Sequence, residues 1–493
     1  MDLFKRQEEI PLNTGDTAFV LLCAVLIMIM IPGVGLFYSG LSHSKNSLYI
    51  ILVGVVSLSI VAIQWVFIGY SLAFSFTSNP IIGNFKNALM LNIGSSISTV
   101  APGIPTLAFA IFQFMFAAIT PIISLGSVCT KVRLLPLCLY IFLWTTLAYD
   151  PIAYWSCTSN GWIVKFGGLD FAGGTIIHIA SGVSSLTFCL YLRLKESYDS
   201  KQQKPHNPLN VFFGTLFIWF GWYGFNSGSA LSANPRAAVA FISTNTAAAF
   251  GAVVFSLLKY KENNYKFSIV DLCVGALAGL IGITPGCGFV PIWASPIVGA
   301  ITAVACFYGL RLKHVMRVND SCDVFAIHGI GGIVGGLLTG IFASKDIALY
   351  NGTEIKGGWI DKNWKQVPIQ MLSMLSCAAW CMAWTAIILF FMEYVLRINL
   401  RISSEKQALG ADYALLTEPM FEYIISPDTF VDMQEEKCLK PLMIQESDDI
   451  KNEKLAMPTT KPSTSKSYNP SAFPSTSTSV APSLFDLTKI EKN

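Results

Sequence analysis

Two histidines lie inside apolar stretches of this 493-residue chain, where an ionisable side chain is costly and therefore suggests a function. His178 lies in DFAGGTIIHIASG (170–182), and His328 lies in DVFAIHGIGG (323–332). A single buried histidine is often a structural hydrogen-bonding group, but two in matching contexts indicate a shared site. Neutral imidazoles carry one donor and one acceptor each. Side by side in an apolar pore, they can relay a proton or guide a small polar solute.

Paired histidines can also ligate haem. A membrane cytochrome with several haems usually carries histidine pairs on shared helices, and that pattern is missing from this sequence. We therefore expect no cofactor. The sequence also shows no nucleotide-binding loop, metal-ligand cluster or catalytic triad, so it does not indicate an enzyme or a metal site.

Carboxylates precede both histidines along the chain. Asp170 comes eight residues before His178, and Asp323 comes five residues before His328. An acidic side chain at the start of a helix can accept hydrogen bonds from the free backbone N–H groups. We predict that both aspartates cap helices and that Asp170 also shapes a cation site at the outer entrance. A further acid in an apolar run, Asp150, has no role that the sequence assigns.

Aromatic side chains could complete such a site. Phe112 and Phe116 are four residues apart and therefore share one helix face. Phe225 stands beside a Ser-Gly pair. Ring faces attract cations, and an aromatic plug excludes water, although most aromatic residues in membrane helices only pack.

The elements that must position these residues are membrane helices. The chain is 53% hydrophobic and 13% charged with a mean hydropathy of +0.55, whereas soluble domains carry roughly a quarter charged residues. A membrane helix needs about 20 apolar residues. Eleven such runs predict an all-α polytopic membrane protein. We expect the lipid bilayer as its partner, and we expect no nucleic-acid partner. The runs centre near residues 28, 60, 115, 145, 184, 218, 248, 276, 300, 335 and 382.

Loop charges predict the orientation of these spans. The loops on one side carry 13 Lys and Arg residues and those on the other side carry 7, and the richer side is normally cytoplasmic. This places the N-terminus outside and the C-terminus inside. The final outer loop holds a sequon, with Asn351 as a possible glycosylation site.

The predicted organisation has three parts: an extracellular N-terminus (1–16), an eleven-helix domain (17–400) and a cytoplasmic tail (401–493). The tail is rich in Ser, Thr and Pro and has few large apolar residues. Such a segment cannot bury enough surface to fold alone. We predict that it is largely disordered and serves either as a spacer or as a regulatory arm.

Eleven spans suggest an internal repeat of five plus five, with one additional helix. The first and sixth spans both contain Phe-x-Ser-Gly, and the fifth and tenth spans carry His178 and His328. An odd number of spans per half makes the two halves face opposite ways. The functional site of such an inverted repeat is expected where the halves meet, near the middle of the membrane.

Several dispersed motifs now resemble one family. They are IPGVGLFYSGL (31–41), LDFAGGTIIHIASG (169–182), GWYGFNSGSA (221–230), GITPGCGFV (282–290) and CDVFAIHGIGGIVGGLLTGIF (322–342). The chain resembles the Amt/Mep/Rh ammonium transporters. QWVFIGYSLAFS (64–75) and TSNGW (158–162) look like the fungal or another eukaryotic branch of the Amt/Mep proteins.

The resemblance implies a plasma-membrane homotrimer with one pore per subunit for ammonium and methylammonium. Ammonium would be recruited outside, lose a proton at the entrance and pass the histidines as ammonia, with charge transfer. A sensor that signals through its tail, with little flux, is the alternative. By position, the resemblance implies twin pore histidines (His178, His328), a stacked gate (Phe116, Phe225), a recruitment site (Phe116, Ser229, Cys157, Asp170) and pore-side support (Trp222, Thr284, Phe112).

Two positions depart from the pattern of the family. Cys157 stands where much of the family has a tryptophan in the recruitment site, a loss expected to weaken cation binding by ~1–2 kcal/mol. Thr130 replaces a glutamate in an inner loop that contacts the tail in the family, and the tail segment 407–418 resembles the regulatory segment only loosely. Thr130 and the loose match of segment 407–418 both argue against docking of the tail onto the inner loop.

Overall fold

The structure is a computed structural model that describes residues 12–77, 79–94, 96–193 and 204–418. Its regular elements are helices; outside them, these residues form only two isolated β-bridges, Ile97 with Pro105 and Val132 with Arg401. The prediction of an all-α protein is therefore confirmed for the described part of the chain.

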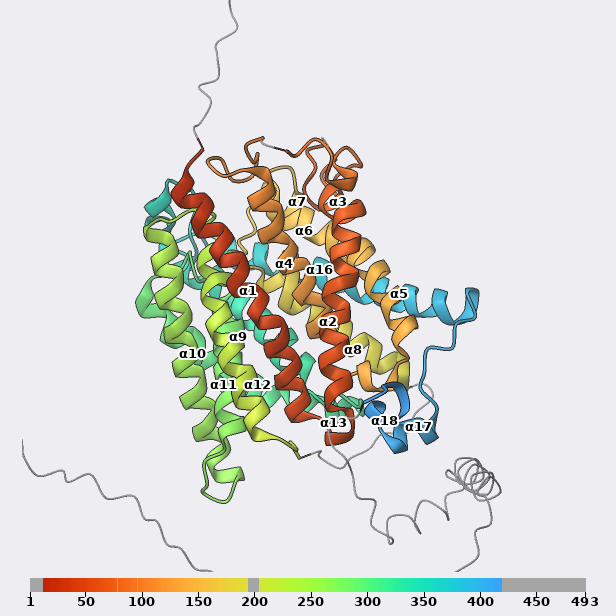
Figure 1. Cartoon of the computed structure of the whole chain (residues 1–493). Coiled ribbons are helices and arrows are strands. Elements are labelled where there is room, and N and C mark those ends of the chain that lie inside the picture. Colours follow the sequence, from red (N-terminus) through yellow and green to blue (C-terminus); the bar gives the residue numbers. More distant parts are fainter. Residues whose placement is uncertain (1–11, 78, 95, 194–203, 419–493) are drawn as a thin grey trace, which may run out of the picture. The chain divides into compact units, whose positions relative to one another are not determined.

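A helical segment covers each of the eleven predicted span centres (Figure 1). The first five are α1 (Thr14–Leu41), α2 (Ser47–Gln64) continuing through η2 (Trp65–Gly69) into α3 (Tyr70–Phe74), α4 (Thr106–Leu125), α5 (Leu134–Trp144) continuing through η5 (Thr145–Tyr149) into α6 (Asp150–Cys157), and η6 (Gly174–Ile179) continuing into α8 (Ala180–Arg193). The next six are α9 (Pro208–Gly228), α10 (Pro235–Glu262), α11 (Ile269–Ile283), α12 (Ser295–Gly309), η8 (Phe325–Ile330) continuing into α14 (Gly331–Phe342), and α16 (Gln366–Phe390) continuing into η11 (Phe391–Val395).

The remaining helices are short. They are α7 (Trp162–Phe166), α13 (Leu312–Met316), α15 (Lys345–Ala348), α17 (Ser404–Leu409), α18 (Ala411–Leu415) and the 3₁₀ turns η1 (Ser44–Asn46), η3 (Ala88–Met90), η4 (Cys129–Lys131), η7 (Ile292–Ala294), η9 (Leu349–Asn351) and η10 (Trp359–Asp361).

Nine helical stretches in the described residues are long and apolar enough to cross a membrane. The two predicted spans outside this set are α9 and α11. Helix α11 has only 15 residues, and the Trp, Tyr, Asn and Gly residues of α9 lower its mean hydropathy although it has 21 residues.

Local sequence signals begin several of these helices. The side chains of Asn13, Asn207 and Asn234 accept backbone N–H bonds in the first turns of α1, α9 and α10. Proline follows at the first helical position of α9 and α10. An Asn cap satisfies donors that have no partner within the helix, and proline costs least at that position.

Glycine allows the first and sixth spans to approach closely. Helices α1 and α9 run side by side (Figure 1). A Cβ on Gly214 of α9 would lie 2.5 Å from the backbone nitrogen of Phe37, and one on Gly40 of α1 would lie 2.6 Å from the carbonyl oxygen of Asn207. Small residues permit such backbone contact in an apolar environment. The two helices that share the Phe-x-Ser-Gly motif are therefore packed against each other.

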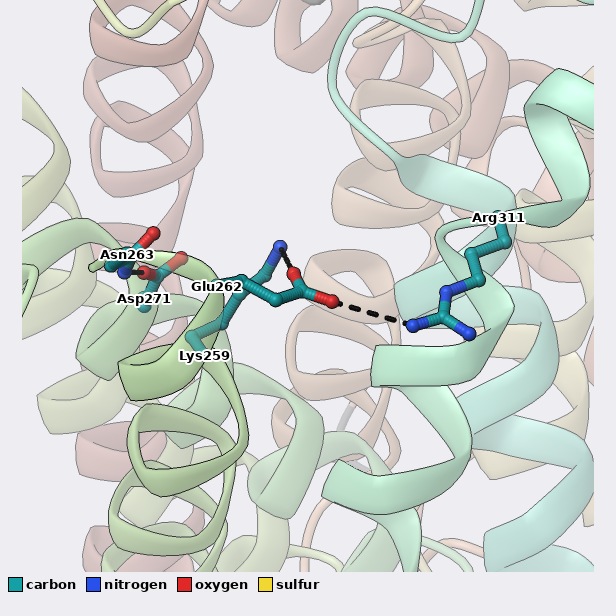
Figure 2. Close-up of polar contacts among 5 residues, drawn as sticks. All are labelled: Lys259, Glu262, Asn263, Asp271 and Arg311. Carbon is teal, nitrogen blue, oxygen red and sulfur yellow. Dashed lines mark hydrogen bonds and ion pairs between the residues drawn. The ribbon is translucent and has the colours of Figure 1, made fainter. Parts of the chain in front are cut away.

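Polar side chains tie the ends of three helices together (Figure 2). Glu262, at the end of α10, pairs with Lys259 at 3.0 Å and with Arg311, just beyond α12, at 3.3 Å. Asn263 donates to Asp271 in the first turn of α11 at 2.6 Å. Lys259 and Arg311 belong to the loops predicted to be cytoplasmic, so this network lies on the predicted inner side.

The described part of the tail packs against the helices. We did not expect this contact, because Thr130 departs from the pattern of the family in the loop that was expected to contact the tail. Asp412 of α18 accepts backbone N–H bonds from Leu48 at 3.1 Å and Tyr49 at 2.9 Å, at the start of α2. The loop around Thr130 pairs with the chain after α16 through backbone bonds, which do not require the missing glutamate. Residues 419–493, where the rest of the tail was predicted to be disordered, lie outside the described residues.

Candidate pore site

The two predicted histidines meet. Nδ1 of His178 lies 3.2 Å from Nδ1 of His328, and the ring centroids are 5.3 Å apart. Because both contact atoms are Nδ1, one ring must donate and the other must accept. Nε2 of His178 is buried and has no hydrogen-bond partner among the described residues. The two imidazoles therefore form a donor–acceptor pair, and Nε2 of His178 is an unpartnered nitrogen of that pair.

Both histidines lie in π-helical turns. His178 is in η6 and His328 is in η8, and each turn leads into a regular helix, α8 or α14. Single π-turns within helices are rare and occur frequently at functional sites. Glycines bring the two segments together, because a Cβ on Gly182 would collide with the backbone of Gly329.

Carboxylates cap both segments, but one of the two predicted caps is wrong. Asp170 accepts N–H bonds from Gly173, Gly174 and Thr175 at 3.0, 2.6 and 2.8 Å, as predicted. The cap before His328 is Asp320 rather than Asp323. The eight-residue spacing from Asp170 to His178 recurs from Asp320 to His328, and this spacing was the sequence signal that could have identified it.

Asp320 has three partners. Its carboxylate accepts N–H bonds from Val324 at 3.0 Å and from Phe325 at 3.1 Å, and it also accepts from the Ser127 hydroxyl. Asp323 takes a different position because its φ is +54°, and it forms an ion pair with Lys313 at 2.7 Å. Both residues line the larger of the two cavities described below.

Burial shifts the pKa of two of these carboxyl groups. It raises the pKa of Asp170 above the ordinary value, although the N–H groups that donate to Asp170 act in the opposite direction. Burial raises the pKa of Asp323 to about 6, and the Lys313 ammonium group limits that rise. Asp323 therefore titrates near physiological pH.

Trp222 holds His178 from one side. The two rings stack with centroids 5.2 Å apart and an interplanar angle of 19°. The indole Nε1 of Trp222 donates to the Thr284 hydroxyl at 3.0 Å, and that hydroxyl donates to the carbonyl of Leu280 at 2.8 Å. Trp222 and Thr284, both predicted as pore-side support, thus fix the plane of the imidazole.

The phenylalanines form a continuous stack next to His178. The rings of Phe116 and Phe225 are 4.4 Å apart at 24°, and Phe225 is 6.2 Å from His178. Phe112 packs on Phe116 at 5.0 Å. Gly228 leaves room for Phe112, since a Cβ there would lie 2.6 Å from its ring. Phe116 and Phe225 are buried, so no open passage crosses this pair.

The other residues of the predicted recruitment site lie at helix ends. The Ser229 hydroxyl donates to the carbonyl of Phe225 at 2.9 Å. Cys157 is half-buried at the last position of α6. Trp155 cannot replace the missing tryptophan: its Nε1 donates to Ile81 at 2.6 Å, and its ring packs on Trp380 at 5.2 Å.

Two cavities adjoin the histidine pair. The first is lined by both histidines, by aromatic side chains that include Trp222 and Phe225, and by aliphatic side chains, and its volume is about 10 Å³. That is roughly the minimum for one water molecule, and a mostly apolar cavity of that size tends to stay dry. The second has a volume of about 780 Å³ and extends from His328 past Asp323 and Lys313. A narrow, apolar segment thus opens into a wide, charged vestibule.

Asn351 of the sequon lies away from the histidines. Its Oδ1 accepts from the guanidinium of Arg236 at 3.2 Å and from the hydroxyl of Thr353 at 2.8 Å. Arg236 is itself held between the rings of Phe171 and Phe289, at 4.7 and 4.5 Å from their centroids. Asn351 is exposed, and its amide nitrogen is the atom to which a glycan would be attached.

Fold and site together define a helical membrane protein with a buried, histidine-lined cavity. The model of the Ammonium Transporter Family matches residues 18–421, and the chain therefore belongs to this family.

Named relatives agree with this assignment. Ammonium transporter 1 of Schizosaccharomyces pombe is 41% identical over 418 residues, which are 84% of this chain and 84% of that protein. Ammonium transporter MEP2 of Saccharomyces cerevisiae is 39% identical over 405 residues, 80% of this chain and 81% of that protein. The crystal structure of Candida albicans Mep2 matches with a TM-score of 0.78 at 38% identity and covers 87% of this chain and 95% of that one.

Proposed function

We propose that this protein transports ammonium and methylammonium across a membrane by releasing a proton and passing the neutral amine along the histidine pair. The observation that carries the proposal is the contact between His178 and His328 beside a small, mostly apolar cavity that Phe225, stacked on Phe116, also lines. The names of the relatives support the substrate.

The dry cavity gives selectivity a physical basis. Removing an ion from water without new partners costs many kcal/mol. NH₄⁺ avoids this cost by leaving its proton behind, whereas K⁺, which has a similar size, cannot lose its charge. Before it is deprotonated, the cation would bind at the recruitment residues that the family resemblance implies, Phe116, Ser229, Cys157 and Asp170, where an aromatic ring can attract it.

The histidine pair also offers a path for the proton. A ring that donates from Nδ1 to a second Nδ1 can pass a proton along the contact when the free Nε2 of His178 takes up another. We propose that the released proton follows this route and that ammonium transport is therefore electrogenic.

The arrangement in the membrane is also part of the proposal. We propose eleven spans in an inverted five-plus-five repeat, an extracellular N-terminus, a cytoplasmic regulatory tail, a homotrimer and a plasma-membrane location. The paired π-turns with their matching caps support the repeat, and the loop charges support the orientation. A glycan on Asn351 would fit the same orientation.

Ammonium-driven current in proteoliposomes tests the mechanism. We expect current with the native protein and its loss when His178→Ala and His328→Ala are combined. The variant must keep the native melting temperature and size-exclusion profile for this comparison to hold. Ammonium uptake without charge movement by the native protein would refute the electrogenic route, and native-like current in the folded double variant would refute the role of the pair.

A sensor with little flux is the second candidate, favoured by Cys157 in the recruitment site and by the Ser/Thr-rich tail. Uptake and ammonium-dependent signalling should be measured in cells after truncation at about residue 420. A transporter keeps its uptake, whereas a sensor loses its signal and shows little uptake either before or after truncation.

A further inference from the structure

A second polar pair is buried among apolar helices, apart from the histidine contact. Asp150 begins α6 just after the π-turn η5, and Gln64 ends α2 just before the π-turn η2. Both side chains are completely buried. Gln64 donates from Nε2 to Asp150 Oδ2 at 2.7 Å. The pair thus connects two helices at the points where each departs from regular α-geometry.

Two acceptor oxygens of this pair lack a hydrogen-bond donor in the part of the chain that the structure describes. Gln64 uses its other Nε2 hydrogen on the Thr146 hydroxyl at 3.1 Å, and Thr146 donates its own proton to the carbonyl of Phe142 at 2.8 Å. Asp150 Oδ1 and Gln64 Oε1 are buried and have no partner among the described residues. Both are acceptors if the carboxyl is ionised, so neither can satisfy the other.

No charged group nearby can stabilise an ionised carboxylate. Helices α2, α4 and α16 pack against η5, and α3 packs against α6. Apart from Asp150, the segments 47–74, 106–125, 134–157 and 366–390 contain no Asp, Glu, Lys, Arg or His.

The titratable groups that remain nearby do not supply a counter-charge. Those on the packed segments include Tyr70, Tyr149, Tyr154 and Cys157, which are ordinarily neutral at pH 7. The other elements that touch α6 contribute Lys165 of α7, which is exposed, and His178 of η6, which contacts His328 and Trp222. A buried carboxylate without a cation partner is therefore costly as an ion.

We infer that Asp150 and Gln64 form an intramembrane proton-binding site. The bound proton sits on Oδ1 of Asp150 and is donated to Oε1 of Gln64, which gives a two-point acid–amide pair. One proton satisfies both unpartnered atoms. The same conclusion holds if the Gln64 amide is flipped so that its oxygen and nitrogen exchange places. Oε1 would then face Asp150 Oδ2, and a proton would be needed between these two oxygens.

The ligand is a proton rather than a metal cation. Metal cations such as Ca²⁺ take six or more oxygens. Among the described residues, this site has only two unpartnered oxygens, and a single hydrogen bond between them would satisfy both. Gly69 shows that the amide is closely fitted, since a Cβ there would collide with Gln64 Oε1. Asp150 acts as a positioning residue: it fixes α6, which carries Cys157 at its other end, against α2.

Infrared difference spectroscopy tests the protonation directly and does not depend on the proposed transport function. We expect the spectrum of native protein minus Asp150→Asn, at neutral pH, to contain the C=O stretch of a protonated carboxylic acid. Asp271→Asn, at the polar end of α11, controls for the loss of one aspartate and should not remove this band. A difference that contains only ionised-carboxylate bands would overturn the inference.

Substitutions test the positioning role. Asp150→Asn preserves both hydrogen bonds without a proton, so we expect uptake within about twofold of native and an unchanged melting temperature. Gln64→Leu and Asp150→Leu each leave one buried polar group unpaired and should each lower the melting temperature. The double variant Gln64→Leu/Asp150→Leu should lower it by less than the sum of the two. Additive effects, or a folded Asp150→Asn protein that loses uptake more than fivefold, would contradict the acid–amide pair.

Discussion

Cys157 is a position of the predicted recruitment site at which a tryptophan would be expected to bind the ammonium cation more tightly. The indole of Trp155 is committed to Ile81 and Trp380, so it cannot serve as a wall for the cation. We predict that Cys157→Trp lowers the ammonium concentration for half-maximal uptake about tenfold, because a cation–π contact contributes ~1–2 kcal/mol. Uptake kinetics measure this, with Cys157→Leu as a control for bulk. Equal effects of Trp and Leu would contradict a cation–π origin.

Asp323 gives the charged vestibule a pH-dependent charge. Burial raises its pKa from 3.8 to about 6, so the fold favours the protonated form and loses stability as the pH rises through about 6. Asp323→Asn cannot ionise, and Asn tolerates the positive φ at this position.

We therefore predict that the native protein loses stability relative to Asp323→Asn between pH 4 and pH 7. The loss is at most roughly 3 kcal/mol, at 1.36 kcal/mol per pKa unit. Melting temperatures of both proteins across this range check the sign. A difference that stays constant with pH would show that Asp323 does not titrate there.

At the residue scale, the sequence predicts which side chains form the site better than it predicts which groups those side chains contact. The histidines could be predicted because ionisable residues are unusual inside apolar helices, whereas the stack of Phe116 on Phe225, which come from different helices, was implied only by the family resemblance. The cap before His328 was assigned to Asp323 because Asp323 lies nearer the helix. The positive φ of Asp323 turns its side chain to Lys313, and Asp320 reaches the helix N-terminus instead. Backbone conformation of this kind is not visible in the sequence.

At the scale of elements, the π-turns η6 and η8 and their two caps act as equivalent parts. Each π-turn places a histidine in the contact, and each cap satisfies backbone N–H groups at its start. The repeat of residue types could be predicted from the sequence, but the π-turns could not. A π-turn depends on tertiary packing, and here glycine lets the two histidine helices approach at Gly182.

This equivalence predicts that the two caps contribute similarly. Asp320→Ala removes two N–H acceptor contacts and a serine contact, and Asp170→Ala removes three N–H contacts. Each should destabilise the protein by about 1–3 kcal/mol and should disturb the histidine contact, so ammonium uptake should fall in both. Asp323→Asn is the control on the same loop, because it removes a charge without straining the positive φ of this position. Greater loss of uptake for Asp323→Asn than for Asp320→Ala would refute the assignment of the cap.

At the scale of the whole molecule, composition and hydropathy predicted the architecture well. Every predicted span centre falls in a helix. The docking of the described tail segment could not be predicted from the Thr130 position, because its contacts run through backbone atoms. Arg133 donates its N–H to the carbonyl of Leu400 at 2.9 Å, and Ile402 donates to that of Lys131 at 3.0 Å. Backbone pairing is nearly independent of side-chain identity.

Asp412 links the docked tail segment to the helices through its side chain, which is buried and accepts two N–H groups at the start of α2. A carboxylate at a helix N-terminus is also favoured by the helix dipole. Nearby, Ala411 donates its N–H to Asn46 at 2.8 Å, and Gln407 lines the same vestibule as His328. Release of this segment would therefore alter the lining of the vestibule.

Asp412→Ala should detach the segment. Hydrogen bonds to charged groups contribute about 1.5–3 kcal/mol, so the opened population should rise at least tenfold, and limited proteolysis between residues 403 and 418 should accelerate accordingly. We also expect a changed uptake rate. Glu405→Ala makes the same charge change at an exposed position of α17 and should leave both measurements near native. If Glu405→Ala accelerates cleavage as much as Asp412→Ala does, net charge rather than the capping contact holds the segment in place.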